Sequence, residues 1–154
     1  MSIREANLSD SENLHILVMD AVQDRRNDDF DERGWELFCK HYEVNSIRER
    51  LQDNQYLTLC YTEDEKVLGV IAIYKSEKLD QLFIHPTARR KGVATSLWNA
   101  ARKICEAGGA KPNYWLKSSP MAISLYESFG FQLAAEKENK IGITLYPMQF
   151  KRAD

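Results

Sequence analysis

The sequence is poor in the residues that divide a chain or cross-link it. Its 154 residues include seven glycines, four prolines and three cysteines, and no Gly/Pro-rich linker, repeat or low-complexity stretch separates one part from another. The cysteines, Cys39, Cys60 and Cys105, are odd in number and lack C-x-x-C spacing, which argues against a disulfide framework or a zinc site. We therefore expect a single domain over residues 1–154, no metal, and cysteines that serve as small core side chains.

Long apolar runs and an excess of positive charge are also missing. The longest apolar runs span only a few residues, as at Val70–Tyr74, and the segment at residues 1–12 lacks the apolar core of a signal peptide. The formal net charge is −2 and the pI is about 6.0, whereas general binders of nucleic acid or anionic membranes are normally basic. We expect a cytoplasmic protein with neither a nucleic-acid nor a membrane partner.

Two capping-box patterns in the N-terminal half predict helix starts. Ser9 and Glu12 form one pattern, and Ser46 with Glu49 forms another, ahead of a short helix that is expected to end near Asp53. Apolar residues recur at helical spacing in two groups divided by a polar stretch: Leu14, Leu17, Val18, Ala21 and Val22, then Trp35, Phe38 and Tyr42. The pattern therefore predicts helices before any long strand.

From residue 56 the pattern changes to strands. Residues 56–62 and 66–75 flank a short polar turn and are expected to pair as an antiparallel hairpin, with 79–85 as the next strand. Further strands are expected at 2–6, 113–117, 131–136 and 142–151. Because strands and helices interleave, we expect a mixed α/β (α+β) domain with a largely antiparallel sheet flanked by helices.

Glycine and proline mark the remaining boundaries. A helix is expected to begin near Gly92, and another at Ser119 with Pro120 in its first turn, ending at Gly130 as a left-handed cap. The first of these helices has one expected apolar face: Val93, Leu97, Ala101, Ile104 and Gly108. Pro147 predicts an edge or bulge position for the last strand.

A basic turn stands directly before the helix that begins near Gly92. Arg89, Arg90 and Lys91 repel one another and meet the positive end of the helix dipole, so the arrangement is costly unless an anion binds there. The first backbone N–H groups of the helix are free for such an anion, and glycine lets it approach closely. A solvated basic turn fits the spacing alone equally well. Neither G-x-x-x-x-G-K-[ST] nor G-x-G-x-x-G occurs, which excludes two common phosphate motifs.

The residues around this turn resemble the GNAT superfamily of acyl-CoA-dependent N-acyltransferases. That family's signature R/Q-x-x-G-x-G/A follows a strand ending in V-x-P, and here Ile84-His85-Pro86 precedes the matching run Arg89, Arg90, Lys91, Gly92, Val93 and Ala94. Its second region, N-x-x-A-x-x-x-Y-x-x-x-G-F, is matched by Ala122, Tyr126, Gly130 and Phe131, with Ser119 in place of Asn. The order of strands and helices is also similar to the family's.

The resemblance implies acetyl-CoA as the cosubstrate. Its diphosphate would lie on the backbone amides at about Arg90 to Thr95, and its pantetheine arm would bond to the main chain of the preceding strand. The implied cofactor-binding residues are Leu82, Phe83, Ile84, Arg89, Arg90, Lys91, Gly92, Val93, Ala94, Thr95 and Ser119. The charged turn would then be the counter-ion of a diphosphate.

Acyl transfer from a thioester to an amine also needs groups that move protons. Tyr126 is the candidate general acid, because a phenol with an unperturbed pKa of roughly 10 holds its proton at neutral pH; a core aromatic is the alternative interpretation. Asp80, expected on the same side of its strand as Leu82 and Ile84, is the candidate base. His85 or a chain of waters could fill that role instead, and Ile84 marks the backbone expected to steady the oxyanion.

These residues together predict an N-acetyltransferase that moves an acetyl group from acetyl-CoA, by direct attack, to a primary amine of a small molecule or a peptide. A non-catalytic acyl-CoA-binding sensor or partner module with the same fold is the alternative. An acidic stretch comprising Asp24, Asp28, Asp29, Asp31 and Glu32 favours a cationic acceptor, although a solvated loop explains it as well. The sequence leaves open the acceptor's identity, the acyl length and the oligomeric state, a homodimer included.

Overall fold

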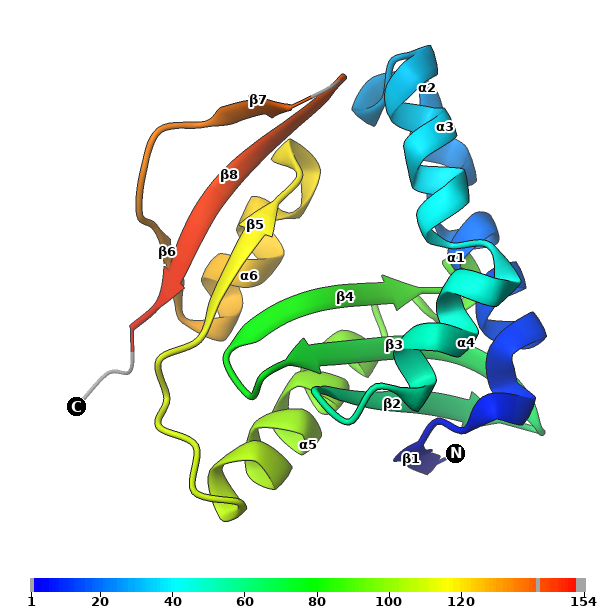
Figure 1. The fold of residues 1–154 in the computed structure, drawn as a ribbon. Helices are drawn as coiled ribbons and strands as arrows, with labels where there is room; N and C mark the ends of the chain where they lie inside the picture. Colours follow the sequence, from blue (N-terminus) through cyan, green and yellow to red (C-terminus); the bar gives the residue numbers. More distant parts are fainter. Residues whose placement is uncertain (1, 141, 152–154) are drawn as a thin grey trace.

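The computed structural model describes residues 2–140 and 142–151, and it has the predicted mixed α/β fold (Figure 1). The strands are β1 (Ser2–Glu5), β2 (Tyr56–Glu63), β3 (Lys66–Tyr74), β4 (Lys78–Ile84), β5 (Trp115–Ser118), β6 (Phe131–Leu133), β7 (Glu138–Lys140) and β8 (Ile143–Phe150). The helices are α1 (Ser11–Val22), α2 (Arg26–Asp29), α3 (Glu32–His41), α4 (Val44–Gln52), α5 (Val93–Ala107) and α6 (Ile123–Phe129). The sequence pattern did not predict α2 and β7, which are very short.

The sheet is divided near its middle. Its strand order is β1-β2-β3-β4-β5-β8-β6, with β7 beside β8. The paired strands run antiparallel except β4 and β5, which are parallel and share the single residue pair Lys78 and Trp115. Beyond that pair the two strands diverge, as Figure 1 shows. The divergence separates β1–β4 from β5–β8 and leaves one edge of β4 open.

The β2–β3 hairpin is confirmed. Asp64 and Glu65 at its turn both have positive φ angles, 51° and 65°, the backbone that a two-residue hairpin turn requires. Polar residues tolerate this conformation better than branched or apolar ones. The short polar turn was therefore a valid signal for the hairpin.

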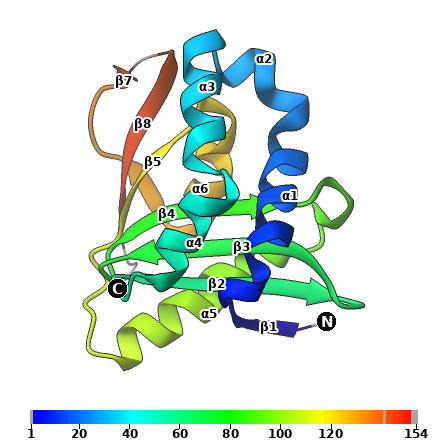
Figure 2. The same cartoon turned by 45° about the vertical axis from the view of Figure 1, so that its right-hand side comes forward.

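Helices cover both faces of β2–β4, and successive residues of β3 divide between them. Ile71 packs in the core cluster that holds Leu97 of α5, whereas its neighbour Val70 packs with Leu14 of α1 and Ile47 of α4. Because successive strand side chains point to opposite faces, α5 lies on one side of the sheet and α1 and α4 on the other (Figure 2). The gap between β4 and β5 therefore connects two different layers.

The predicted apolar face of α5 is partly wrong. Trp98 and Cys105 are buried with Leu97, whereas Ile104 is 49 % exposed and Gly108 lies just beyond the helix. The buried stripe advances in steps of four, through Ala101 to Cys105, and leaves Ile104 at its side. The helix start at Gly92 and the left-handed Gly130 after α6, with φ angles of 77° and 105°, are confirmed.

Neither predicted capping box forms. At the first, Asn7 and Asp10 make the box around a short 3₁₀ turn, and Ser9 donates its N–H to the Asn7 side chain. The helix α1 then begins at Ser11, and the predicted Ser9 and Glu12 pair is two residues out of place. An asparagine two residues earlier competes for the same backbone donors.

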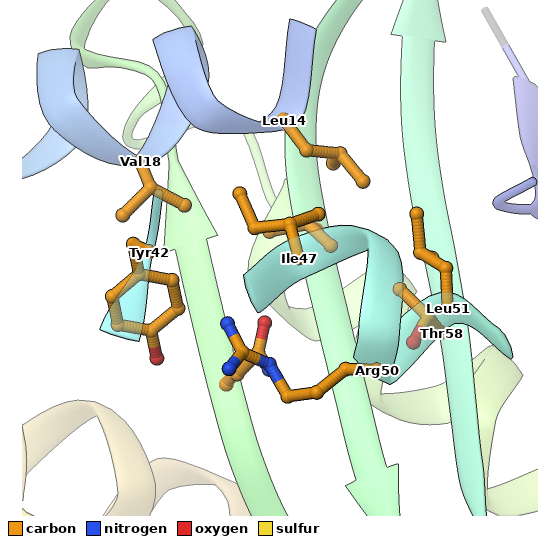
Figure 3. A pocket seen from close by; sticks show the side chains of 9 residues that line it. Leu14, Val18, Tyr42, Ile47, Arg50, Leu51 and Thr58 are labelled. Atoms are coloured by element: carbon orange, nitrogen blue, oxygen red, sulfur yellow. The ribbon is translucent and has the colours of Figure 1, made fainter. Parts of the chain in front are cut away.

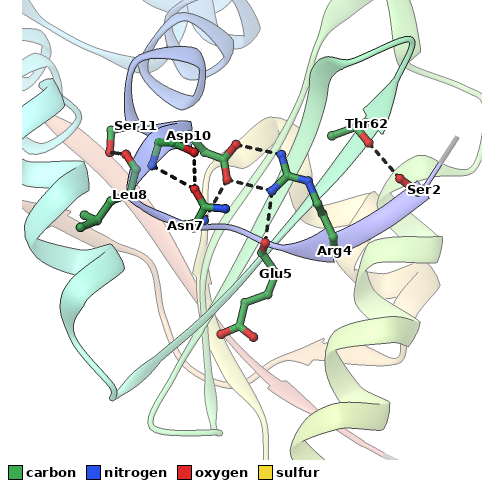
Figure 4. Close-up of polar contacts among 9 residues, drawn as sticks. Ser2, Arg4, Glu5, Asn7, Leu8, Asp10, Ser11 and Thr62 are labelled. Atoms are coloured by element: carbon green, nitrogen blue, oxygen red, sulfur yellow. Dashed lines mark hydrogen bonds and ion pairs between the residues drawn. The ribbon is translucent and has the colours of Figure 1, made fainter.

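Asp10 has a further role, which Figure 4 shows. Arg4 on β1 donates two hydrogen bonds to its carboxylate, at 2.8 and 2.9 Å, and the Asn7 N–H donates a third at 2.8 Å. The hydrogen bond from Arg4 is the main cause that holds the pKa of Asp10 below its usual range. This ion pair ties the edge strand β1 to the start of α1.

At the second predicted box, Ser46 lies inside α4 and donates its hydroxyl to the carbonyl of Lys40. Glu43 precedes the helix, and Glu49 takes no part in capping its start. The end of α4 next to Asp53 is as predicted. Because the chain between α3 and α4 is short, the Ser46 hydroxyl reaches a carbonyl in the last turn of α3 and does not cap the first turn of α4.

Pro147 is not at an edge, since β8 lies between β5 and β6. The carbonyl of Pro147 accepts the N–H of Ala134, just after β6 ends. The proline nitrogen, which has no hydrogen to donate, lies on the same side of β8, opposite the segment between β6 and β7, where that side of β8 has no paired strand. The interruption explains why proline is tolerated in an interior strand. Among the described residues, no helix combines the length and apolar character needed to cross a membrane.

Candidate active site

A deep cleft opens where β4 and β5 part. It encloses about 820 Å³, near the upper end of the roughly 300–1,000 Å³ of ordinary small-molecule pockets. Its walls come from β4, the first turn of α5, and α6 on one side of the sheet, and from α2, α3 and β8 at the other end. The cleft therefore runs through the divided sheet.

One end of the cleft is the N-terminus of α5. Gly92, Val93, Ala94 and Thr95 all line it. The first helical hydrogen bond runs from Ser96 to the Gly92 carbonyl, so the helix itself leaves the preceding three N–H groups unused. A Cβ atom on Gly92 would have nothing within 4 Å, and no side chain within the described ranges caps this end. The geometry suits an anion approaching the backbone.

The three cations before Gly92 are not equivalent. Arg90 is exposed, lines the cleft and has a φ of 63°. Arg89 also lines the cleft, but its guanidinium donates to the Asp24 carboxylate at 3.0 Å and to the carbonyl of Ala21. Lys91 is exposed and lies outside the cleft lining. Arg89 therefore fixes the turn to the end of α1, and its charge is already paired with a carboxylate.

Strand β4 contains a bulge at Asp80. Gln81 pairs with Ala72 and Leu79 with Ile73, so Asp80 has no partner on β3. The bulge breaks the alternation of side chains: Leu79, not Asp80, shares the α5 face with Leu82. The predicted side for Asp80 is thus wrong, although it lines the cleft and contacts Lys78 at 3.2 Å.

The other β4 candidates divide between the two faces. Leu82 and Ile84 pack toward α5, and Phe83 packs against Phe38 and Tyr42 on the opposite side, with ring centroids 6.2 and 5.2 Å apart. All three β4 residues line the cleft. The strand therefore offers its backbone edge to the gap while its side chains anchor it to both layers.

Tyr126 of α6 lines the cleft beside Ser119. Burial raises the pKa of Tyr126 to about 12, against a smaller opposing effect of Arg25, so the phenol is protonated at neutral pH. Its ring also contacts Phe131, with centroids 6.1 Å apart. Ser119 is the N-cap residue before Pro120, as predicted, but its hydroxyl makes no capping bond. It thus remains available toward the cleft.

Of two histidines near the cleft, His41 lines it and His85, the alternative base expected from the sequence, does not. His85 lies outside the cleft lining: its Nδ1 accepts the Thr87 N–H at 3.2 Å, and its Nε2 is 3.4 Å from Asp20. His41, at the end of α3, does line the cleft. Burial and then the charge of Arg50 lower the pKa of His41. No sequence motif marked His41, because only the fold brings α3 to β4.

The acidic stretch contributes one residue to the cleft, Asp29, whose pKa is raised by burial. Asp24 is paired with Arg89, and Asp31 caps α3 by accepting the N–H of Gly34 at 2.8 Å. The other two acidic residues are exposed and do not line it. Across residues 2–140 and 142–151, no cluster of three or more His, Cys, Asp or Glu side chains is arranged to hold a metal ion.

A second, small cavity lies between α1, α4 and the sheet (Figure 3). Most of its lining is apolar, including Leu14, Ile47 and Val70. Tyr42 and Gln81 line both this cavity and the cleft. Tyr42 is 6 % exposed, and burial raises its pKa. Its ring therefore forms part of the partition between the two spaces.

Comparison with known proteins gives consistent results. A family model described as an acetyltransferase (GNAT) domain matches residues 26–152. The zebrafish (Danio rerio) protein N-alpha-acetyltransferase 50 is 28% identical over 112 residues, which cover 67% of each chain. The crystal structure of PaiA N-acetyltransferase from Thermoplasma acidophilum, in complex with coenzyme A, is similar with a TM-score of 0.84 at 20% identity, covering 98% of both chains. A GCN5-related N-acetyltransferase structure from Rhodopseudomonas palustris has a TM-score of 0.83 at 20% identity, covering 98% of this chain and 95% of that one.

Proposed function

Because the chain belongs to the GNAT acetyltransferase family, we propose that it transfers an acetyl group from acetyl-CoA to a primary amine. The observation that carries the proposal is a single cleft that joins the free N-terminus of α5 to Tyr126 and Asp80 through the divided sheet. The coenzyme A bound in the Thermoplasma relative and the N-alpha-acetyltransferase activity named for the zebrafish relative support the same interpretation.

The α5 end of the cleft suits the diphosphate of the cosubstrate. In this proposal the N–H groups of Val93, Ala94 and Thr95 donate to it, and Arg90, which also lines the cleft, adds positive charge. Gly92 leaves room for the approach. The open edge of β4 at residues 82–84 then holds the pantetheine arm through its main chain, and Ser119 faces that arm from the other side. Acetyl-CoA itself supplies a thioester carbonyl that is activated toward amines.

The transfer makes one bond and breaks another. The amine nitrogen bonds to the thioester carbonyl carbon, the C–S bond breaks, the amine loses a proton and the thiolate gains one. Backbone N–H groups near Ile84 steady the oxyanion, a contact worth about 3 kcal/mol. The products are an N-acetyl amide and free coenzyme A.

Tyr126 is the proposed proton donor to sulfur. A phenol with a pKa near 12 is a weaker acid than a thiol, whose ordinary pKa is about 8.5. Tyr126 therefore stabilises the developing thiolate by donating a hydrogen bond to it while the C–S bond breaks. Complete transfer of the phenol proton to sulfur before the C–S bond breaks is unfavourable. Asp80, held beside Lys78, is the proposed acceptor of the amine's proton. His41 on the same cleft is the second candidate for that role.

The proposal is tested by incubating the purified protein with acetyl-CoA and a panel of primary amines. Free thiol and N-acetyl product are measured together, by colour reaction and by mass spectrometry. Amide formed in equal amount to thiol supports the proposal. Thiol release that does not depend on amine would identify a thioesterase, and tight acetyl-CoA binding without turnover would identify a sensor; either result contradicts the proposal.

A further inference from the structure

The end of the cleft away from α5 has apolar side chains on two sides. Its apolar lining there comes from the α2–α3 segment and from β8: Phe30, Leu37, Phe38, Ile143 and Leu145. The two segments meet where the N–H of Asp31 donates to the carbonyl of Gly142 at 3.3 Å. Figure 1 shows the end of the β7–β8 hairpin beside α2 and α3. This end, which we call the acceptor end, lies on the opposite side of the sheet from α5.

Within residues 2–140 and 142–151, the protein leaves these apolar groups partly uncovered. Leu37 is 43 % exposed, and Phe30 and Phe38 are half-buried. The aromatic rings of this wall hold one another in place: the centroid of Phe38 lies 4.9 Å from that of Phe30 and 4.7 Å from that of Tyr42. A ligand that covers a fixed apolar wall removes apolar surface from water, which stabilises the complex by about 25 cal/mol per Å² of area covered. The wall therefore favours an acceptor with an apolar body.

The charges at the acceptor end disfavour a second cation on the acceptor. In the part of the chain that the structure describes, three cationic side chains of this lining lie near a carboxylate: Lys78 near Asp80, Lys117 near Glu138, and Arg25 near Asp29. The first two pairs are in contact at 3.2 Å, and the charge of Arg25 opposes the effect of burial on the pKa of Asp29. A polyamine would have to displace these pairs and lose its own hydration against an apolar wall.

We propose that the acceptor is a primary amine whose amino group is attached close to one bulky apolar group, with no second positive charge. This inference rests on the proposed N-acetyltransferase activity and narrows its substrate class. A free alkyl or arylalkyl amine has this chemistry, and so does a peptide whose first residue has a large apolar side chain. Two arms of one experiment distinguish these sources.

The experiment compares matched acceptors at saturating acetyl-CoA. Heptylamine and 1,6-diaminohexane differ by a terminal methyl group in place of an ammonium, and Phe-Ala-Ala and Gly-Ala-Ala differ by the first side chain. We expect kcat/KM to favour the apolar member by about 10-fold or more in at least one pair, since a single apolar group in a fitted pocket discriminates by that factor. The pair that does so identifies a free amine or a peptide N-terminus as the source.

Leu37→Glu tests the wall itself, and Ile104→Glu is the control. Ile104 is similarly exposed, at 49 %, on α5 and outside the cleft lining. We expect Leu37→Glu to reduce the apolar preference by about 10-fold and Ile104→Glu to leave it unchanged. The preference is a ratio within one variant, so a partial loss of folded protein cancels.

The possible results separate a failure of this inference from a failure of the proposed activity. Equal or better turnover of 1,6-diaminohexane and Gly-Ala-Ala overturns the inference and leaves the proposed activity intact. An unchanged preference in Leu37→Glu overturns it as well. Absence of amide with every acceptor overturns the proposed activity, and the inference falls with it.

Discussion

Substitution of Gly92 separates the cost of its backbone conformation from its place in the anion site. Its φ of 77° disfavours any residue with a Cβ, and nothing lies within 4 Å of a Cβ built there. Gly92→Ala and Gly92→Glu should therefore lose the same amount of stability, about 1–2 kcal/mol, through backbone strain and without a clash. For a domain of this length that loss lowers Tm by roughly 2–8 °C.

The two variants should differ in binding coenzyme A. A carboxylate about 4 Å from a phosphate charge costs on the order of 4 kcal/mol at an effective dielectric constant of 20. Even with half of that cost screened or relaxed, Gly92→Glu should bind at least about 30-fold more weakly, whereas Gly92→Ala, with open space around its methyl group, should change affinity by less than about threefold.

Isothermal titration with coenzyme A measures both affinities, and a thermal melt of each variant checks the shared strain. Gly92→Ala is the matched control, because it carries the strain without the charge. Equal affinities for the alanine and glutamate variants, at similar Tm, would refute the claim that an anion binds at this turn.

Three further outcomes follow from the geometry. Tyr126→Phe keeps the ring contacts with Phe131 and should lower kcat by roughly 10²-fold with little change in the KM for acetyl-CoA, as steady-state rates will show. Asp10→Asn should lose about 2 kcal/mol of stability at pH 7 in urea unfolding, because Arg4 loses its charged partner. Since the folded-state pKa of Asp10 is lowered, that contribution is present above the unfolded pKa and is lost as pH falls through the folded one, so the two proteins should converge in acid. Asp28→Asn with Glu32→Gln should leave the acceptor KM unchanged at low salt, because neither residue lines the cleft; a raised KM would restore the acidic stretch as an acceptor site.

Features set by a few neighbouring residues were predictable from the sequence. The β2–β3 hairpin, the start of α5 at Gly92 and the end of α6 at Gly130 each depend on turn residues whose allowed φ angles are local properties. The family resemblance rested on the same kind of short motif, and three of the residues that it singled out, Arg89, Arg90 and Tyr126, line one cleft.

Features set by contacts between distant residues were not predictable in this way. The bulge at Asp80 depends on its register against β3, and the pairing of Arg89 with Asp24 joins residues 65 positions apart. His41 reaches the cleft only because α3 packs over β4. The capping boxes failed for a related reason: Asn7 and Lys40 offered competing partners that the spacing of Ser9 or Ser46 alone did not reveal.

The central claim is that this cleft transfers an acetyl group, and a single-turnover experiment tests it most directly. Protein in excess is mixed with acetyl-CoA labelled at the carbonyl carbon and with heptylamine or Phe-Ala-Ala, and labelled amide and free thiol are followed by NMR and mass spectrometry. The account predicts one labelled amide for each thiol released in the wild-type protein, with transfer slowed by roughly 10²-fold in Tyr126→Phe. Labelled acetate in place of amide, or label that stays on coenzyme A, would contradict it.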